Sequence, residues 1–148
     1  MSEVIAGGRC LCGATRYELH ADPLWVAYCH CESCRRATGA PVSTYLGCAV
    51  DSVTWLGDQP RLFASSHDAR RGSCASCCSP MTYESSRWAG EVHLHISTLD
   101  DPGRFPPRAH VYFSERIDWF EVHDKLPRFA TTRVREAKPD SHGPLEGQ

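Results

Sequence analysis

The sequence has no long apolar run, no excess of charge of either sign and few segments with helical periodicity. No stretch of its 148 residues approaches the length of a membrane span, and the net charge of -2 gives no electrostatic footprint for nucleic acid or an anionic membrane. The N-terminal segment MSEVIAGGRC has neither the basic region nor the apolar core of a secretory signal. We therefore expect a cytoplasmic protein with no nucleic-acid or membrane partner.

Length and composition favour one globular domain. A chain of 148 residues can bury a hydrophobic core without disulfides, and its 41% apolar and 23% charged residues are typical of a folded protein. The final stretch TTRVREAKPDSHGPLEGQ is polar, with only two large aliphatic residues. We predict one domain over residues 1–129 and a disordered tail over 130–148.

Short runs of β-branched and aromatic residues recur along the chain, separated by Gly, Pro, Asp and Ser. In CGATRYELH, the residues Thr15, Tyr17 and Leu19 alternate with polar ones, as in a half-buried strand. Similar runs are LWVAYC, VSTYLGCAV, RLFASS, MTYES and EVHLHIS, and VYFSERIDWFEV is a late strand or irregular segment. Only CESCRRAT can hold a helical turn or two. This pattern predicts a mainly β domain rather than a βαβ fold.

Nine cysteines are the most informative feature of the sequence: Cys10, Cys12, Cys29, Cys31, Cys34, Cys48, Cys74, Cys77 and Cys78. Their odd number and the missing signal argue against a secreted disulfide scaffold. In a reducing compartment, clustered cysteines more often bind metal or carry out redox chemistry.

The spacing of these cysteines suits zinc. A structural zinc takes four protein ligands, whereas a catalytic zinc keeps three and an open position. Cys10 and Cys12 share a face if they lie on a strand, and Cys74 and Cys77 have the spacing of a zinc knuckle, so the two pairs can close a four-thiolate site. One compact loop then supplies a three-thiolate cluster, formed by Cys29, Cys31 and Cys34.

Spacing alone leaves two alternatives open. Either Cys48 or Cys78 can supply a fourth thiolate and make both sites structural. The segments CESC and CASC also fit the Cys-x-x-Cys pattern of redox proteins, although the chain lacks the βαβ setting of a thioredoxin-like site.

Four segments carry a resemblance to a known family: GRCLCGATRYEL, YCHCESCRRATGAP, RRGSCASCCSPM and HVYFSERIDWFEVHDKLPRF. In this order they resemble the glutathione-dependent formaldehyde-activating enzymes, the family of the centromere protein V domain, from about Gly8 to Phe129. The resemblance implies a β-tent fold, similar to that of a small guanine-nucleotide-exchange chaperone, with two zinc ions per chain. It implies a structural zinc at Cys10, Cys12, Cys74 and Cys77 and an active-site zinc at Cys29, Cys31 and Cys34.

The resemblance also implies an activity, the synthesis of S-hydroxymethylglutathione from glutathione and formaldehyde, which is classed as a carbon-sulfur lyase reaction. Addition of a thiol to an aldehyde needs a thiolate, and zinc with an open position can bind sulfur in that form. Three cysteine thiolates around Zn²⁺ give a net charge of about -1 and weaken its Lewis acidity. We therefore expect the site to position a thiol rather than to activate the carbonyl group.

Two functions of other classes compete with this activity, because thiol addition to formaldehyde is already facile without a catalyst. One is a non-catalytic, zinc-stabilised binding or chaperone-like module. The other is a redox-sensing thiol protein, which would lose zinc reversibly as disulfides form.

Several residues beside the cysteines have expected roles. Arg35 directly follows a cysteine of the cluster and can pair with a carboxylate of a glutathione-like ligand. His30 faces away from its two cysteine neighbours if the segment is extended, so we expect it to pack or to support them. His93 and His95 share one strand face, which a polar surface explains as simply as metal binding. Cys78 stands where the family has glycine, which puts the geometry of that turn in doubt.

Overall fold

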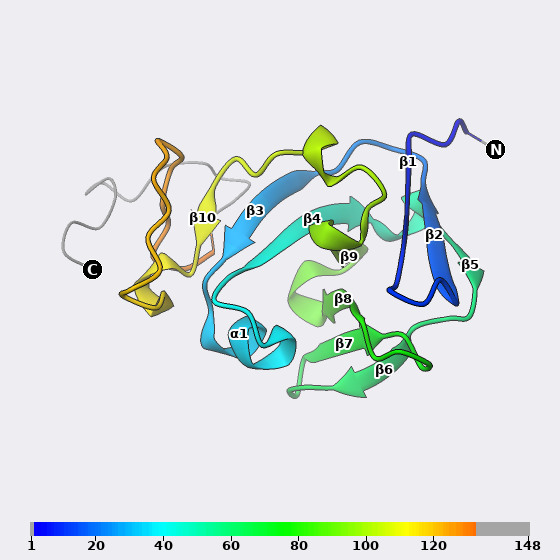
Figure 1. Cartoon of the computed structure of the whole chain (residues 1–148), viewed down its shortest axis with the longest axis horizontal. Helices are drawn as coiled ribbons and strands as arrows, with labels where there is room; N and C mark the ends of the chain where they lie inside the picture. Colours follow the sequence, from blue (N-terminus) through cyan, green and yellow to red (C-terminus); the bar gives the residue numbers. More distant parts are fainter. Residues whose placement is uncertain (1, 133–148) are drawn as a thin grey trace. The chain divides into compact units, whose positions relative to one another are not determined.

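The computed structural model describes residues 2–132, and this part of the chain is mainly β with one α-helix, as the sequence predicts. The chain forms two compact units. Unit 1 comprises the residues up to Leu24 together with Leu46–Phe105, and unit 2 comprises Trp25–Tyr45 and the residues from Pro106 onward. Strand β4 (Ser43–Ala49) passes from unit 2 into unit 1 (Figure 1). Among the helices described, none is long and apolar enough to cross a membrane.

Unit 1 contains a three-stranded antiparallel sheet in which β2 lies between β1 and β5. The bounds are Ala6–Arg9 for β1, Thr15–Leu19 for β2 and Val53–Gly57 for β5. The side chains of Thr15, Tyr17 and Leu19 are all buried, which confirms the predicted alternation of β2. A five-residue turn, 10–14, joins β1 to β2 and carries the first two cysteines.

Unit 1 also contains an antiparallel run of four strands in chain order: β6 (Arg61–Ala64), β7 (Ala69–Ser73), β8 (Pro80–Ser85) and β9 (Glu91–His95). Met81 and Leu94 are fully buried in its core. The register between β7 and β8 shifts at Gly72 and Ser73, immediately before Cys74. This irregularity ends the β7–β8 ladder at the loop that carries the second pair of cysteines.

Unit 2 places one short helix directly after a strand. Strand β3 (Trp25–Cys29) pairs in parallel with β10 (His110–Val111), and helix α1 (Glu32–Thr38) begins three residues after β3 ends. Cys31 is the N-cap of α1, and its sulfur accepts a hydrogen bond from the Cys34 N–H. Gly39 ends the helix in the left-handed conformation. The predicted helical segment CESCRRAT is thus confirmed.

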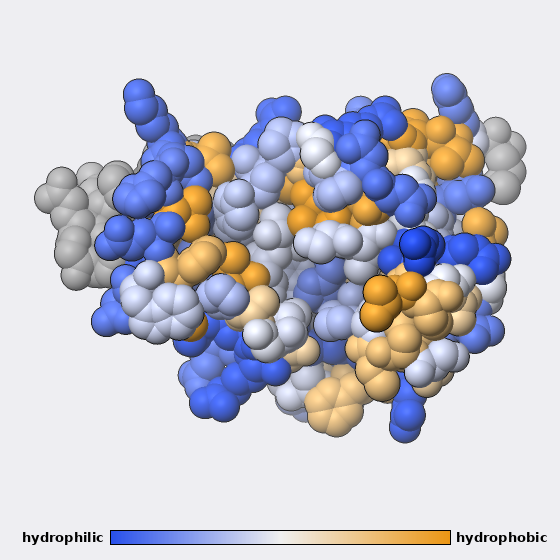
Figure 2. All heavy atoms as spheres, in the orientation of Figure 1, coloured by the Kyte–Doolittle hydropathy of each residue, from blue (hydrophilic) through white to orange (hydrophobic). Residues whose placement is uncertain are grey.

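Short 3-10 helices complete the described structure at Val50–Ser52, Ser86–Trp88, Ile96–Thr98, Pro102–Arg104 and Phe113–Glu115. Polar residues cover most of the face shown in Figure 2, with hydrophobic residues in small patches, which is typical of a globular domain surface. The predicted tail lies outside the described residues from 133 onward, while Ala130 and Thr131 accept backbone hydrogen bonds from Ser114 and Tyr112. The domain boundary at residue 129 stays a prediction.

Candidate metal centres

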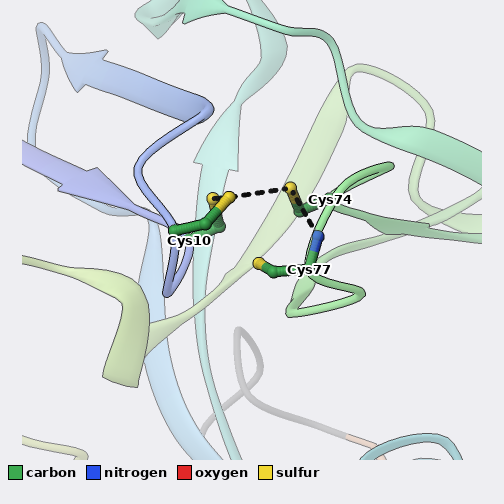
Figure 3. Close-up of side chains that lie close together, drawn as sticks. Cys10, Cys74 and Cys77 are labelled. Carbon is green, nitrogen blue, oxygen red and sulfur yellow. Dashed lines mark hydrogen bonds between the residues drawn. The ribbon is translucent and has the colours of Figure 1, made fainter.

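The structure brings the pair Cys10 and Cys12 together with the pair Cys74 and Cys77 in unit 1. Their four sulfur atoms all lie within 4.8 Å of one another, and this four-cysteine group consists of Cys10, Cys12, Cys74 and Cys77. The Sγ atoms of Cys10 and Cys12 are 3.6 Å apart, and those of Cys12 and Cys74 are 3.8 Å apart. A tetrahedral zinc with Zn–S bonds of about 2.3 Å has S···S edges of about 3.8 Å. Figure 3 shows the sulfurs of Cys10, Cys74 and Cys77 facing a common centre, so this group fits a tetrahedral ion.

Each half of the four-cysteine group is a tight turn closed by a backbone hydrogen bond. The N–H of Gly13 donates to the Cys10 carbonyl at 3.2 Å, and the N–H of Cys78 donates to the Cys74 carbonyl at 2.9 Å. Gly13 and Cys78 both have positive φ, 80° and 65°. The expectation that Cys10 and Cys12 share a strand is therefore wrong: β1 ends before Cys10, and it is the turn that brings both sulfurs to one side.

Ser79 links the two turns, and sequence reasoning missed it. Its Oγ accepts a hydrogen bond from the Leu11 N–H at 3.0 Å and lies 3.0 Å from the Cys77 sulfur. This hydroxyl makes the largest contribution to lowering the pKa of Cys77 to about 5, and backbone hydrogen bonds with Cys12 and Ser79 add to it. The backbone N–H groups of Cys77 and Ser76 donate to the sulfur of Cys74 and lower its pKa as well. The turn is thus built to hold thiolates.

The cysteines around the start of α1 form a separate group in unit 2. The sulfurs of Cys29, Cys31 and Cys34 also lie within 4.8 Å of one another, and those of Cys29 and Cys34 are 3.7 Å apart. We call these residues the three-cysteine group. Cys29 ends β3, Cys31 caps α1 and Cys34 lies in the first turn of α1, so the strand-to-helix junction itself gathers the sulfurs. Their spacing again matches the edge of a zinc tetrahedron.

Two thiols of the three-cysteine group hold their protons tightly. Cys29 and Cys34 are buried, and contact with the Cys31 thiol contributes most to raising the pKa of Cys29 well above its usual range. The pKa of Cys31 rises to about 11: its hydrogen bond with Cys29 lowers it, but contact with Cys34 and burial outweigh that effect. The hydroxyl of Tyr45 donates to the sulfur of Cys34 at 3.4 Å. Sequence reasoning missed Tyr45 because nothing in its local pattern points to a thiol.

The two arginines that follow this group differ in their partners. Arg35 donates through Nη2 to the Glu115 carbonyl at 3.2 Å, and its buried Nε has no hydrogen-bond partner among the described residues. Arg36 pairs with Glu32 at 2.9 Å on the exposed face of α1. The role of Arg35 as a substrate-binding residue stays a prediction.

The other cysteines and histidines have separate surroundings. Neither Cys48 nor Cys78 joins the three-cysteine group as a fourth ligand, and neither belongs to the four-cysteine group. Cys48 is fully buried in β4, which raises its pKa to about 12, and Cys78 is exposed. None of the nine cysteines, all of which lie among the described residues, forms a disulfide. His93 lies 3.1 Å from Glu91 in β9, a buried pair within one strand.

One comparison with known proteins, the match to a family profile, identifies the family. The sequence profile of the glutathione-dependent formaldehyde-activating enzymes, a family with a zinc-binding β-tent-like fold, matches residues 5–115. A crystal structure of a Rhodobacter sphaeroides protein matches with a TM-score of 0.48 and 17% identity, over 64% of this chain and 87% of that one. That likeness is too low to bear on function, and a search of curated proteins finds no significant match. Because the profile spans well over half of the chain, the protein belongs to the glutathione-dependent formaldehyde-activating enzyme family and has its mainly β fold.

Proposed function

We propose that the chain binds one zinc ion at each cysteine group and uses the three-cysteine group to position a small thiol, such as glutathione, for addition to an aldehyde such as formaldehyde. The observation that carries the proposal is the difference in donor number between two groups with the same sulfur spacing. Unit 1 supplies four thiols at tetrahedral edge lengths, and unit 2 supplies three. Four protein ligands are typical of structural zinc and three of catalytic zinc. The family assignment supports the same division.

When bound, zinc would supply a site that favours the thiolate form of a substrate sulfur. Cys29, Cys31 and Cys34 would hold the ion. Tyr45 orients the sulfur of Cys34 through its hydroxyl hydrogen bond. The buried Nε of Arg35 is a cationic donor suited to a carboxylate, of which glutathione carries two.

The proposed reaction joins the thiol sulfur to the aldehyde carbon and moves the thiol proton to the aldehyde oxygen, which gives an S-hydroxymethyl thioether. The reverse reaction breaks the same carbon-sulfur bond, which is the lyase direction. The chain's contribution is to bring the two reactants into one orientation and so to reduce the entropic part of the barrier.

Glutathione binding and exchange test this proposal. Calorimetry with zinc-loaded protein measures glutathione binding, and exchange NMR with ¹³C-formaldehyde measures how fast the free and thiol-bound forms interconvert above the uncatalysed rate. We expect Cys31→Ser to lose both signals at least tenfold. The matched control Cys78→Ser removes an exposed thiol outside the four-cysteine group and should keep both.

The same experiment separates the competing classes of function. Glutathione binding without faster exchange would favour a thiol carrier or binding module. If Cys31→Ser binds glutathione and accelerates exchange as well as the wild type, the three-cysteine group is not the reactive site and the proposal is wrong.

A further inference from the structure

A buried chain of hydrogen bonds runs from the three-cysteine group to the segment that follows β10, all within unit 2. His30 stands between Cys29 and Cys31, and its side chain is fully buried. The Nε2 atom of His30 lies 2.8 Å from Nδ1 of His110, which is also fully buried. The Nε2 atom of His110 lies 2.9 Å from Oδ2 of Asp124. Two rings and a carboxylate are thus joined end to end.

The far end of this chain is fixed by a buried arginine. Arg128 is 6% exposed and donates through Nη1 to Oδ1 of Asp124 at 2.9 Å. Its two terminal nitrogens also donate to the carbonyls of Leu126 and Val122. These residues lie beyond residue 115, where the family profile ends. The segment that contains Asp124 and Arg128 therefore holds, through His110, the side chain of His30 between two cysteines of the three-cysteine group.

The direction of each hydrogen bond between these side chains follows from the carboxylate of Asp124, which is the final acceptor. Burial disfavours the ionised form of Asp124, but hydrogen bonds from His110 and the Leu126 N–H outweigh it and keep its pKa below the usual range. An ionised carboxylate only accepts, so Nε2 of His110 donates to it. Burial lowers the pKa of His110, and in the neutral ring Nδ1 is then an acceptor. His30 must donate to it through Nε2.

We propose that His110, Asp124 and Arg128 act as positioning residues for the three-cysteine group, by holding His30 in the Nε2-protonated tautomer and so fixing the backbone between Cys29 and Cys31. This inference rests on the proposed metal binding at that group. The backbone N–H of His30 donates to the Val111 carbonyl at 3.1 Å, so the residue is held at both its main chain and its ring. Hydrogen-bonded groups behind metal ligands commonly set the ligands' orientation.

The other ring nitrogen of His30 supports a functional role over a purely stabilising one. Its Nδ1 is buried and has no hydrogen-bond partner among the described residues. Such an unpaired buried acceptor lowers the stability of the fold. Stability alone therefore does not explain a histidine at this position, whereas the support of two neighbouring cysteines does.

Metal titration of full-length variants tests the proposal. His110→Phe keeps an aromatic ring, though a larger one, and removes both ring hydrogen bonds. Asp124→Asn is a milder change in case the first variant does not fold. Asp118→Asn, an exposed carboxylate on the same segment, is the matched control. We expect His110→Phe to weaken zinc binding at the three-cysteine group by about 10–100-fold and to leave the four-cysteine group unchanged. Asp124→Asn should have a smaller effect of the same kind.

Nitrogen-15 NMR of the imidazole rings gives a second readout, which a simple loss of packing would not move. We expect wild-type His30 to carry its proton on Nε2, and Asp124→Asn to shift that tautomer balance. Protonation of His30 on Nδ1 would overturn the proposal. So would a folded His110→Phe variant that binds zinc at the three-cysteine group as tightly as the wild type. If the wild type itself binds no metal at the three-cysteine group, the proposed function fails, and the tautomer still decides the hydrogen-bond direction.

Discussion

Lowering the pH from 8 to 6 should release metal from the three-cysteine group before the four-cysteine group. A thiol whose pKa lies above the pH must lose its proton to bind an ion, so each such thiol lowers the apparent affinity about tenfold per pH unit. In the three-cysteine group, the pKa of Cys29 is well above its usual range and that of Cys31 is about 11. Over two pH units, these two thiols together weaken binding by about 10⁴-fold.

The four-cysteine group contains thiols of both kinds. A backbone hydrogen bond with Ala14 lowers the pKa of Cys12, but contact with Cys10 and its other sulfur neighbours, together with burial, outweighs it and raises the pKa to about 11. Cys77, with a pKa of about 5, is already a thiolate from pH 6 to 8 and adds no pH dependence. The pKa of Cys74 is also below its usual range. The four-cysteine group therefore has one thiol of raised pKa against two in the three-cysteine group, and we expect its affinity to fall less steeply between pH 8 and 6.

Competition with a chromogenic zinc chelator at pH 8, 7 and 6 measures this difference. In the variant Cys31→Ser, the measured zinc release comes from the four-cysteine group alone. Subtracting it from the wild-type release gives the contribution of the three-cysteine group. Equal slopes for the two groups, or a steeper slope for the four-cysteine group, would refute the reasoning from thiol protonation.

Three further predictions concern single side chains. Gly8→Ala should destabilise the fold by about 2 kcal/mol and lower Tm by about 6 °C, because a Cβ there would lie 2.3 Å from the Tyr17 hydroxyl. The control is Gly7→Ala, whose Cβ would meet only a side-chain oxygen at 3.3 Å and a carbonyl at 3.6 Å, and it should lower Tm less in the same thermal melts. Cys78→Gly should raise the free energy of unfolding in urea by about 0.5–1 kcal/mol, because this residue has a φ of 65°, which strains any residue with a Cβ. Cys78→Ala keeps the Cβ, so an equal gain in that variant would contradict the role of backbone strain. Tyr45→Phe should speed zinc release from the three-cysteine group but not from the four-cysteine group in stopped-flow chelation, and an unchanged rate would show that the hydroxyl does not support the sulfur.

Most strands that the sequence reveals have a buried alternating or apolar face, and β6, which is exposed at all four residues, is an exception. The alternation in β2 is visible because Tyr17 and Leu19 point into the core. Strands β1 and β7 have the sequences AGGR and ARRGS, which lack β-branched and aromatic residues. Their extended state comes from pairing with β2 and β8 and from close approach of the backbone, as at Gly8. Local propensity carries no sign of such pairing.

The grouping of the cysteines could be predicted because few residue types serve as zinc ligands and their spacing restricts the combinations. The turn at Cys10 and Cys12 could not, since it depends on Gly13 taking a positive φ. The supporting residues Tyr45 and Asp124 reach their partners through the tertiary fold, and so does Ser79 in its hydrogen bond with Leu11. No local pattern marks these contacts.

Zinc per chain tests the central claim most directly. It should be measured by mass spectrometry on wild type and Cys31→Ser purified without oxygen or chelator. We expect two equivalents for the wild type and one for the variant, because the four-cysteine group keeps its ion. One equivalent in both proteins would contradict a metal centre at the three-cysteine group, and with it the proposed thiol chemistry.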